Sequence, residues 1–149
     1  MNSMLASRLQ VLSSLALAFI LVPPIKQTLV CLEGHPSVDQ EYKRAFGVLI
    51  GHAVAERAVP ESKDYLDGTA YSVRVDEVLQ GKLPDSIEVF SENTSGRFPM
   101  DVGRKYLLFL YRVLGRTVVD NCGNSGLLSV RAAVVDTVRR LERQSSRDP

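Results

Sequence analysis

Residues 104–114 read RKYLLFLYRVL and contain six consecutive apolar or aromatic side chains, at positions 106–111. An uninterrupted apolar run of this length is typical of a β-strand that is covered on both faces. Gly115 and Arg116 follow the run and predict a tight turn into a second short strand over residues 117–120. This stretch therefore predicts an antiparallel hairpin that forms part of a larger sheet.

The sequence before this hairpin contains three further candidate strands. Residues 69–79 alternate between apolar and polar side chains, as a half-buried strand does. The alternation slips at Asp76 and Glu77, which predicts a β-bulge at that point. Two more strands are expected, over residues 46–56 and 86–91, which makes five in all. The first of these contains two internal glycines, which indicate a bend.

Two helices are expected to flank these strands. Residues 35–44 predict a short helix that starts near Ser37, and Ser129 is a suitable N-cap for a final helix. The apolar stripe of the final helix is expected to consist of Val130, Val134, Val138 and Leu141. The elements together predict a mainly β domain with flanking helices, built as a five-stranded closed barrel of the OB type.

The N-terminal 30 residues differ in composition from the rest of the chain. Residues 1–30 contain two basic residues and no acid, and residues 11–22 form a mostly apolar run that two prolines end. A positive start followed by an apolar run of about 7–15 residues is typical of a secretory signal peptide. An uncleaved membrane anchor and a buried core helix are the alternatives. The folded domain is then expected over residues 31–143, with a flexible tail over residues 144–149.

The charges of the chain are nearly balanced. Its 149 residues include 18 Lys+Arg and 17 Asp+Glu, for a formal net charge of +1, and without residues 1–30 the net charge is −1. A field this weak argues against nucleic-acid binding driven by bulk charge. Two cysteines and two histidines cannot complete a four-ligand zinc site. No catalytic constellation stands out, so we expect no enzyme activity, no metal and no cofactor.

The two cysteines, Cys31 and Cys122, lie near the two ends of the predicted domain. In an oxidising compartment such a pair predicts a disulfide, whereas in the cytosol the two residues would be buried free thiols. The signal-like segment favours the first alternative. We therefore expect a secreted, periplasmic or cell-envelope protein that contacts a membrane only if its N-terminal segment stays uncleaved.

Several local patterns coincide with those of a known family. Four segments follow one another in the same order as in that family: residues 49–54 (LIGHAV), 71–82 (YSVRVDEVLQGK), 102–109 (VGRKYLLF) and 120–126 (DNCGNSG). In this order they resemble the netrin-like family, which is related to the tissue inhibitors of metalloproteinases and has short versions in bacterial exported proteins. The resemblance covers residues 31–141. It implies an OB-type barrel and a disulfide between Cys31 and Cys122.

The resemblance also suggests two possible functions. In the inhibitors, the first cysteine of a Cys-x-Cys motif binds the zinc of the target protease through its amino group and carbonyl. Here Leu29 occupies the position of that first cysteine, and Cys31 matches the second, structural one. We therefore expect a non-catalytic domain that binds a protein or an envelope component. The alternative is a metalloprotease inhibitor that acts through a processed N-terminal segment.

The predicted binding surface combines the segment after Cys31 with two long polar loops, residues 57–68 and 92–103. The candidate binding residues are Leu32, Glu33, His35, Asp64, Tyr65, Asp67, Arg97 and Phe98. His35 and His52 are otherwise expected to be structural or solvated.

Overall fold

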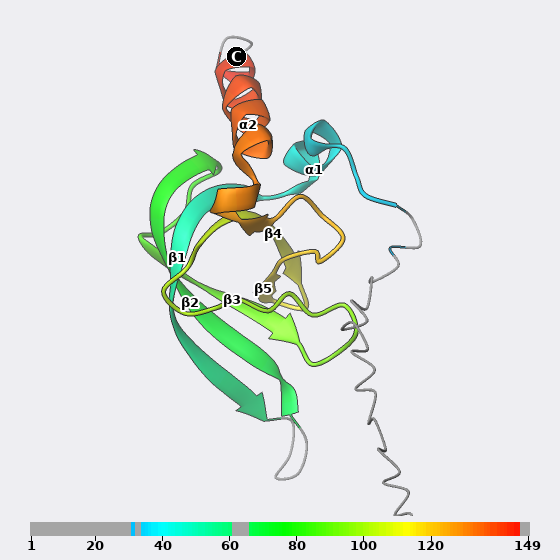
Figure 1. Cartoon of the computed structure of the whole chain (residues 1–149), viewed down its shortest axis with the longest axis vertical. Helices are drawn as coiled ribbons and strands as arrows, with labels where there is room; N and C mark the ends of the chain where they lie inside the picture. Colours follow the sequence, from blue (N-terminus) through cyan, green and yellow to red (C-terminus); the bar gives the residue numbers. More distant parts are fainter. Residues whose placement is uncertain (1–30, 32–33, 61–65, 147–149) are drawn as a thin grey trace, which may run out of the picture.

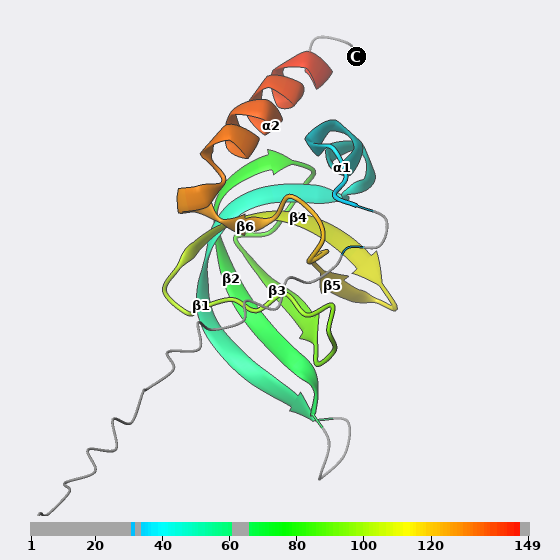
Figure 2. The same ribbon diagram turned by 45° about the vertical axis from the view of Figure 1, so that its right-hand side comes forward.

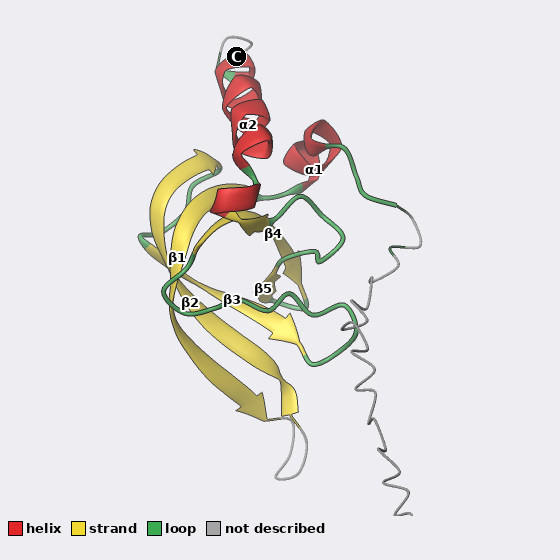
Figure 3. Cartoon of the chain, in the orientation of Figure 1, coloured by secondary structure: helices red, strands yellow, loops and turns green. Residues whose placement is uncertain are grey.

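The computed structural model describes Cys31, residues 34–60 and residues 66–146. The predicted signal peptide and four candidate binding residues (Leu32, Glu33, Asp64 and Tyr65) lie outside these ranges. The described part is mainly β (Figure 3). Its elements are α1 (Val38–Arg44), β1 (Gly47–Pro60), β2 (Leu66–Gln80), β3 (Ser86–Glu92), β4 (Lys105–Val113), β5 (Arg116–Val118), β6 (Gly126–Leu127), the 3-10 turn η1 (Leu128–Val130) and α2 (Ala132–Ser145).

Five strands form a ring. β1 pairs with β2 and with β4, β2 pairs with β3, and β4 pairs with β5, all in antiparallel fashion. The ring is completed by a single parallel pair, Phe90 of β3 with Val118 of β5. The short β6 adds to β4. Both helices lie at one end of the molecule, and the far end of the β1–β2 hairpin extends away from them (Figures 1 and 2).

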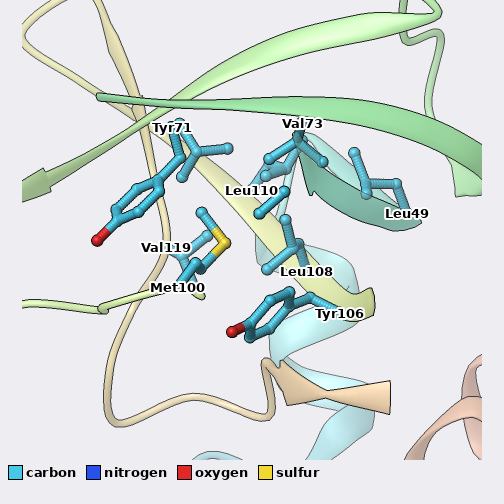
Figure 4. Packing of buried hydrophobic residues seen from close by; sticks show 10 residues of the cluster. Leu49, Tyr71, Val73, Met100, Tyr106, Leu108, Leu110 and Val119 are labelled. Carbon is cyan, nitrogen blue, oxygen red and sulfur yellow. The ribbon is translucent and has the colours of Figure 1, made fainter. Parts of the chain in front are cut away.

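β4 is covered on both faces, which confirms the expectation from its apolar run. Tyr106, Leu108 and Leu110 point into the ring, where they pack with Leu49, Tyr71, Val73, Met100 and Val119 (Figure 4). Leu107 and Phe109 point to the other face, where they pack with residues of α1 and α2. Since residues 106–110 are all buried, this strand separates the two hydrophobic clusters and contributes to each.

The bulge predicted at Asp76 is present. Ile50 of β1 pairs with Glu77 and the next residue, Gly51, pairs with Val75, so Asp76 has no partner of its own in the ladder. The bend also brings β1 and β2 close together at Gly51, where an added Cβ would lie 2.5 Å from the carbonyl oxygen of Arg74. A glycine is therefore required at this position.

The prediction of a loop over residues 57–68 is wrong for most of that range. Arg57 pairs with Ala70 and Val59 pairs with Gly68, so β1 and β2 continue as a two-stranded ribbon to Pro60 and from Leu66. Most of the β1 side chains in this ribbon are exposed. An exposed strand segment carries no apolar alternation, so the β1 half of this ribbon resembles a loop in sequence.

The start of α1 agrees with the prediction from the sequence, whereas the start of α2 differs from it. Ser37 caps α1 in a reciprocal capping box with Gln40, as its position before the helix predicts. Ser129 does not cap α2, because it lies in η1 and the helix begins only at Ala132. Val130 is 72% exposed and is not part of the apolar stripe, in which Val135 is buried instead.

α2 continues to Ser145, so the expected tail is helical at its beginning. None of the helices in the described ranges is long and apolar enough to span a membrane.

Candidate functional site

A disulfide joins Cys31 to Cys122 and attaches the N-terminal segment to the loop between β5 and β6. The disulfide confirms the pairing that the sequence and the family resemblance both indicated. His35 supports the same junction, because its Nδ1 lies 2.8 Å from the carbonyl oxygen of Cys122. The carbonyl oxygen of Cys31 accepts a hydrogen bond from the Gly34 N–H at 2.9 Å. His35 is therefore part of the framework that holds the loop.

A buried glutamate holds the same loop from the other side. Glu41 of α1 is fully buried, and its Oε2 accepts hydrogen bonds from the backbone N–H of Asn124 (2.6 Å) and from the Asn124 side-chain amide (2.7 Å). A Cβ at Gly123 would overlap Glu41 Oε1, so a glycine is needed there. Burial and the negative charge of Glu41 raise the pKa of Tyr111 above its ordinary value. The sequence analysis did not single out Glu41, since a polar residue in a short helix is normally exposed.

Replacement of Glu41 tests its structural role. We expect Glu41→Ala to lower the free energy of unfolding by about 1–3 kcal/mol, because Asn124 loses the acceptor of two hydrogen bonds. Urea denaturation followed by circular dichroism measures this difference. The matched control is Asp39→Ala, an exposed acid in the same helix, for which we expect a change within about 0.5 kcal/mol. Equal effects of the two substitutions would contradict the role of Glu41.

A second polar cluster lies on the outer face of the ring, around Asp76. His52 of β1 lies in register with Lys105 of β4 and with Arg74 of β2, so three basic side chains form a row across three strands. The Asp76 carboxylate lies 2.7 Å from His52 Nδ1, 3.1 Å from Lys105 Nζ and 3.5 Å from Arg74 Nε. The bulge in β2 turns this carboxylate toward the row. The cluster is accounted for by ion pairing between strands.

Burial opposes ionisation of Asp76, but a hydrogen bond from Lys105 and the charges of His52, Lys105 and Arg74 outweigh it, so the pKa of Asp76 lies below its ordinary value. A carboxyl group with a lowered pKa stabilises the fold above its ordinary pKa of about 3.9. That stability is lost as the pH falls through the lower pKa of the folded state.

Substitution of Asp76 by Asn should therefore have a pH-dependent effect. We expect Asp76→Asn to lower the free energy of unfolding by about 1 kcal/mol at pH 7, and the difference from the wild type to shrink below about pH 4. Urea denaturation at a series of pH values measures this. Asp101→Asn, at an exposed position in the loop after β3, serves as the control and should show no such trend. A difference that stays constant with pH would be evidence against the ion-pair account.

Two hollows of the described surface lie beside the β4–β5 hairpin. A cavity of about 500 Å³ opens between this hairpin and β3, and we call it the groove. Its lining residues are Phe46, Arg57, Val59, Lys82, Leu83, Pro84, Ser86, Ile87, Glu88, Phe90, Arg112, Gly115, Arg116 and Thr117. A second hollow of about 500 Å³ shares Phe46 and Arg112 with the groove and also contains Arg44 and Asp120.

The groove combines an aromatic floor with a cationic rim. The Arg112 guanidinium lies 4.8 Å from the centroid of the Phe46 ring, and that of Arg116 lies 4.0 Å from the centroid of the Phe90 ring. Stacking on an aromatic ring fixes a guanidinium in place while its N–H groups stay available to a ligand. Arg116 also pairs with Asp67 at 2.6 Å. The groove therefore brings apolar and cationic side chains together in one concave surface.

Three of the described candidate binding residues lie around one loop. Arg97 and Phe98 are neighbours in the loop after β3, and the carbonyl oxygen of Asp67 accepts the N–H of Asn93 at the start of that loop. Asp67 lies in β2 and reaches the edge of the groove through its pair with Arg116. Phe98 packs edge-on against Tyr106, with ring centroids 6.3 Å apart, and helps to cover the core. Arg97 is exposed in the loop after β3, and His35 lies at the disulfide. Sequence analysis missed the groove, because its cations come from four separate segments.

No protein-family model matches the chain, and no curated protein matches it in sequence. Among the residues that the structure describes, no group of three or more His, Cys, Asp or Glu side chains could hold a metal ion.

Proposed function

We propose that the protein is an exported, non-catalytic protein-binding domain of the OB type that resembles netrin-like domains. The groove beside the β4–β5 hairpin carries this proposal. It offers aromatic and arginine side chains together in a concave surface, and these residue types are enriched in protein–protein interfaces.

The order of the strands in the ring supports the OB-type assignment. Neighbouring strands follow the order β1-β2-β3-β5-β4, and β4 returns to β1. Five strands that close in this way, with long β1 and β2 strands curved by bulges, are what a small Greek-key barrel requires.

The disulfide supports the proposed export. Disulfides persist in oxidising compartments, and the Cys31–Cys122 pair contains both cysteines of the sequence. The disulfide is consistent with the proposed location in the cell envelope or the exterior, where we also expect the partner.

Metalloprotease inhibition is the weaker of the two functions. Leu29 stands where the inhibitors have their zinc-binding cysteine, so inhibition would require processing directly before Cys31. The carbonyl oxygen of Cys31 would then have to bind the metal, and in the structure this oxygen accepts the Gly34 N–H. The cationic groove has no part in such a mechanism. Protein binding through the groove gives a role to its arginine and aromatic side chains, whereas inhibition through the N-terminal segment gives them none.

Site-specific photo-crosslinking in the source cells tests the proposed function. A photoreactive benzoylphenylalanine replaces Ser86, an exposed residue that lines the groove, and in a control variant it replaces the exposed Val130 of η1. We expect a discrete protein adduct from position 86 and none from position 130. A third variant, at Arg97, tests the loop surface that the sequence predicted. The absence of an adduct at all three positions would contradict the proposed function.

A further inference from the structure

One wall of the groove is a strand edge that has no partner strand over part of its length in the described ranges. β3 pairs with β2 along its length, but it meets β5 only at the pair of Phe90 with Val118. Residues 86–89 therefore present an edge that no other described strand covers. Four residues extend over about 13 Å, which is enough for a short peptide to add as a further strand.

The rim of the groove has an excess of positive charge. Arg57 pairs with Glu88 at 2.9 Å and Arg116 pairs with Asp67. In contrast, Lys82 and Arg112 have no carboxylate partner among the described residues, and the same holds for Arg44 in the adjacent hollow. Because the chain as a whole is nearly neutral, this local excess is complementary to an acidic ligand.

The floor of the groove is apolar. Phe46, Leu83 and Ile87 are partly exposed and pack against the core from below the groove. Successive side chains of an extended peptide point to opposite faces, so alternate residues could contact this floor while the others face the cationic rim. The groove thus fits a segment in which apolar and acidic residues alternate.

We propose that the groove binds an extended acidic segment of a partner protein, which adds as a strand to the free edge of β3. Alternate apolar or aromatic side chains of the segment pack on Phe46, Leu83 and Ile87, and its carboxylates pair with Arg112 and Lys82. This inference rests on the proposed function and specifies its ligand. Pairing of main-chain amides with β3 distinguishes a peptide from other polyanions, which lack such groups.

Fluorescence anisotropy with a defined probe tests the inference. The probe is a fluorescein-labelled decapeptide in which Asp alternates with Tyr and Val, titrated with the purified, oxidised protein. We expect Arg112→Glu and Lys82→Glu each to weaken binding by about tenfold or more, since each reverses a charge at the rim. The matched control Arg140→Glu reverses an exposed charge on α2 and should leave binding within about twofold of the wild type.

Two modified probes separate the contributions of charge and strand pairing. A decapeptide with Lys in place of Asp should not bind, and a probe with N-methylated amides at alternate positions should lose binding although its charges are unchanged. Circular dichroism of each variant verifies that it is folded. Equal binding to wild type and Arg112→Glu would overturn the inference, and so would undiminished binding of the N-methylated probe.

Other polyanions are tested in the same assay. The alternative probes are a single-stranded oligonucleotide and anionic phospholipid vesicles. If one of them binds in an Arg112-dependent manner and the acidic decapeptide does not bind, the proposed occupant is wrong. Photo-crosslinking at position 86 then separates two kinds of failure. If the decapeptide does not bind but a protein adduct still forms at position 86, only the acidic peptide is excluded as the ligand. If neither decapeptide binding nor a protein adduct is observed, the protein-binding function is contradicted as well.

Discussion

Phe109→Ala is expected to lower the free energy of unfolding by about 3–5 kcal/mol, through the loss of buried surface and the cavity left behind. Phe109 is fully buried in the cluster between β4 and the two helices. Its backbone N–H also donates a hydrogen bond to Ser125 Oγ at 2.8 Å, so β4 is connected at this residue to the loop that carries Cys122. A loss of this size is a large fraction of the stability of a small domain.

Urea denaturation followed by circular dichroism measures the effect of Phe109→Ala. Val113→Ala, in the same strand at a side chain that is 45% exposed, provides the matched control and should change the stability by less than about 0.5 kcal/mol. A loss below about 1 kcal/mol for Phe109→Ala would mean that the helices do not pack on β4 as described.

Removal of the disulfide has the second large effect. We expect the double variant Cys31→Ser, Cys122→Ser to lose about 4–5 kcal/mol, the value that the chain-entropy account gives for a loop of this length. The sequence separation of the two cysteines is 91 residues. Glu41 and His35 still contact the loop in the variant, so the fold should be destabilised but not rearranged.

Chemical reduction provides the control for the disulfide. A reducing agent should shift the urea midpoint of the wild type to that of the double variant and should not change the variant itself. Mass spectrometry under non-reducing conditions verifies that the wild type is oxidised. If the wild type and the double variant unfold at the same urea concentration, the disulfide does not stabilise the domain.

The sequence predicts those parts of the fold in which the burial of a strand determines the order of its apolar and polar residues. The apolar run at 106–111 predicted a strand buried on both faces, because only such a strand excludes polar residues at every position. The phase slip at Asp76 predicted the bulge, since an extra residue in a strand reverses the alternation beyond it. Both features are local consequences of burial.

The parts that the sequence could not predict depend on contacts between distant segments. The ribbon beyond Arg57 has mostly exposed side chains on β1 and is stabilised by backbone pairing, which leaves no pattern in the residues. Glu41 is buried because Asn124 lies against it, 83 positions away. The groove takes its cations from β1, the β2–β3 turn, β4 and β5, so no single stretch of sequence appears basic. Only the folded ring brings these side chains together.

The central claim, that an exported domain binds a protein through the groove, is tested most directly by combining the crosslinker with charge reversal. Benzoylphenylalanine at position 86 is introduced together with Arg112→Glu, and in a parallel variant together with Arg140→Glu, and the adduct yields are compared in the source cells. The account predicts that Arg112→Glu abolishes the adduct while Arg140→Glu leaves its yield unchanged. Equal adduct yields in the two variants would contradict the account.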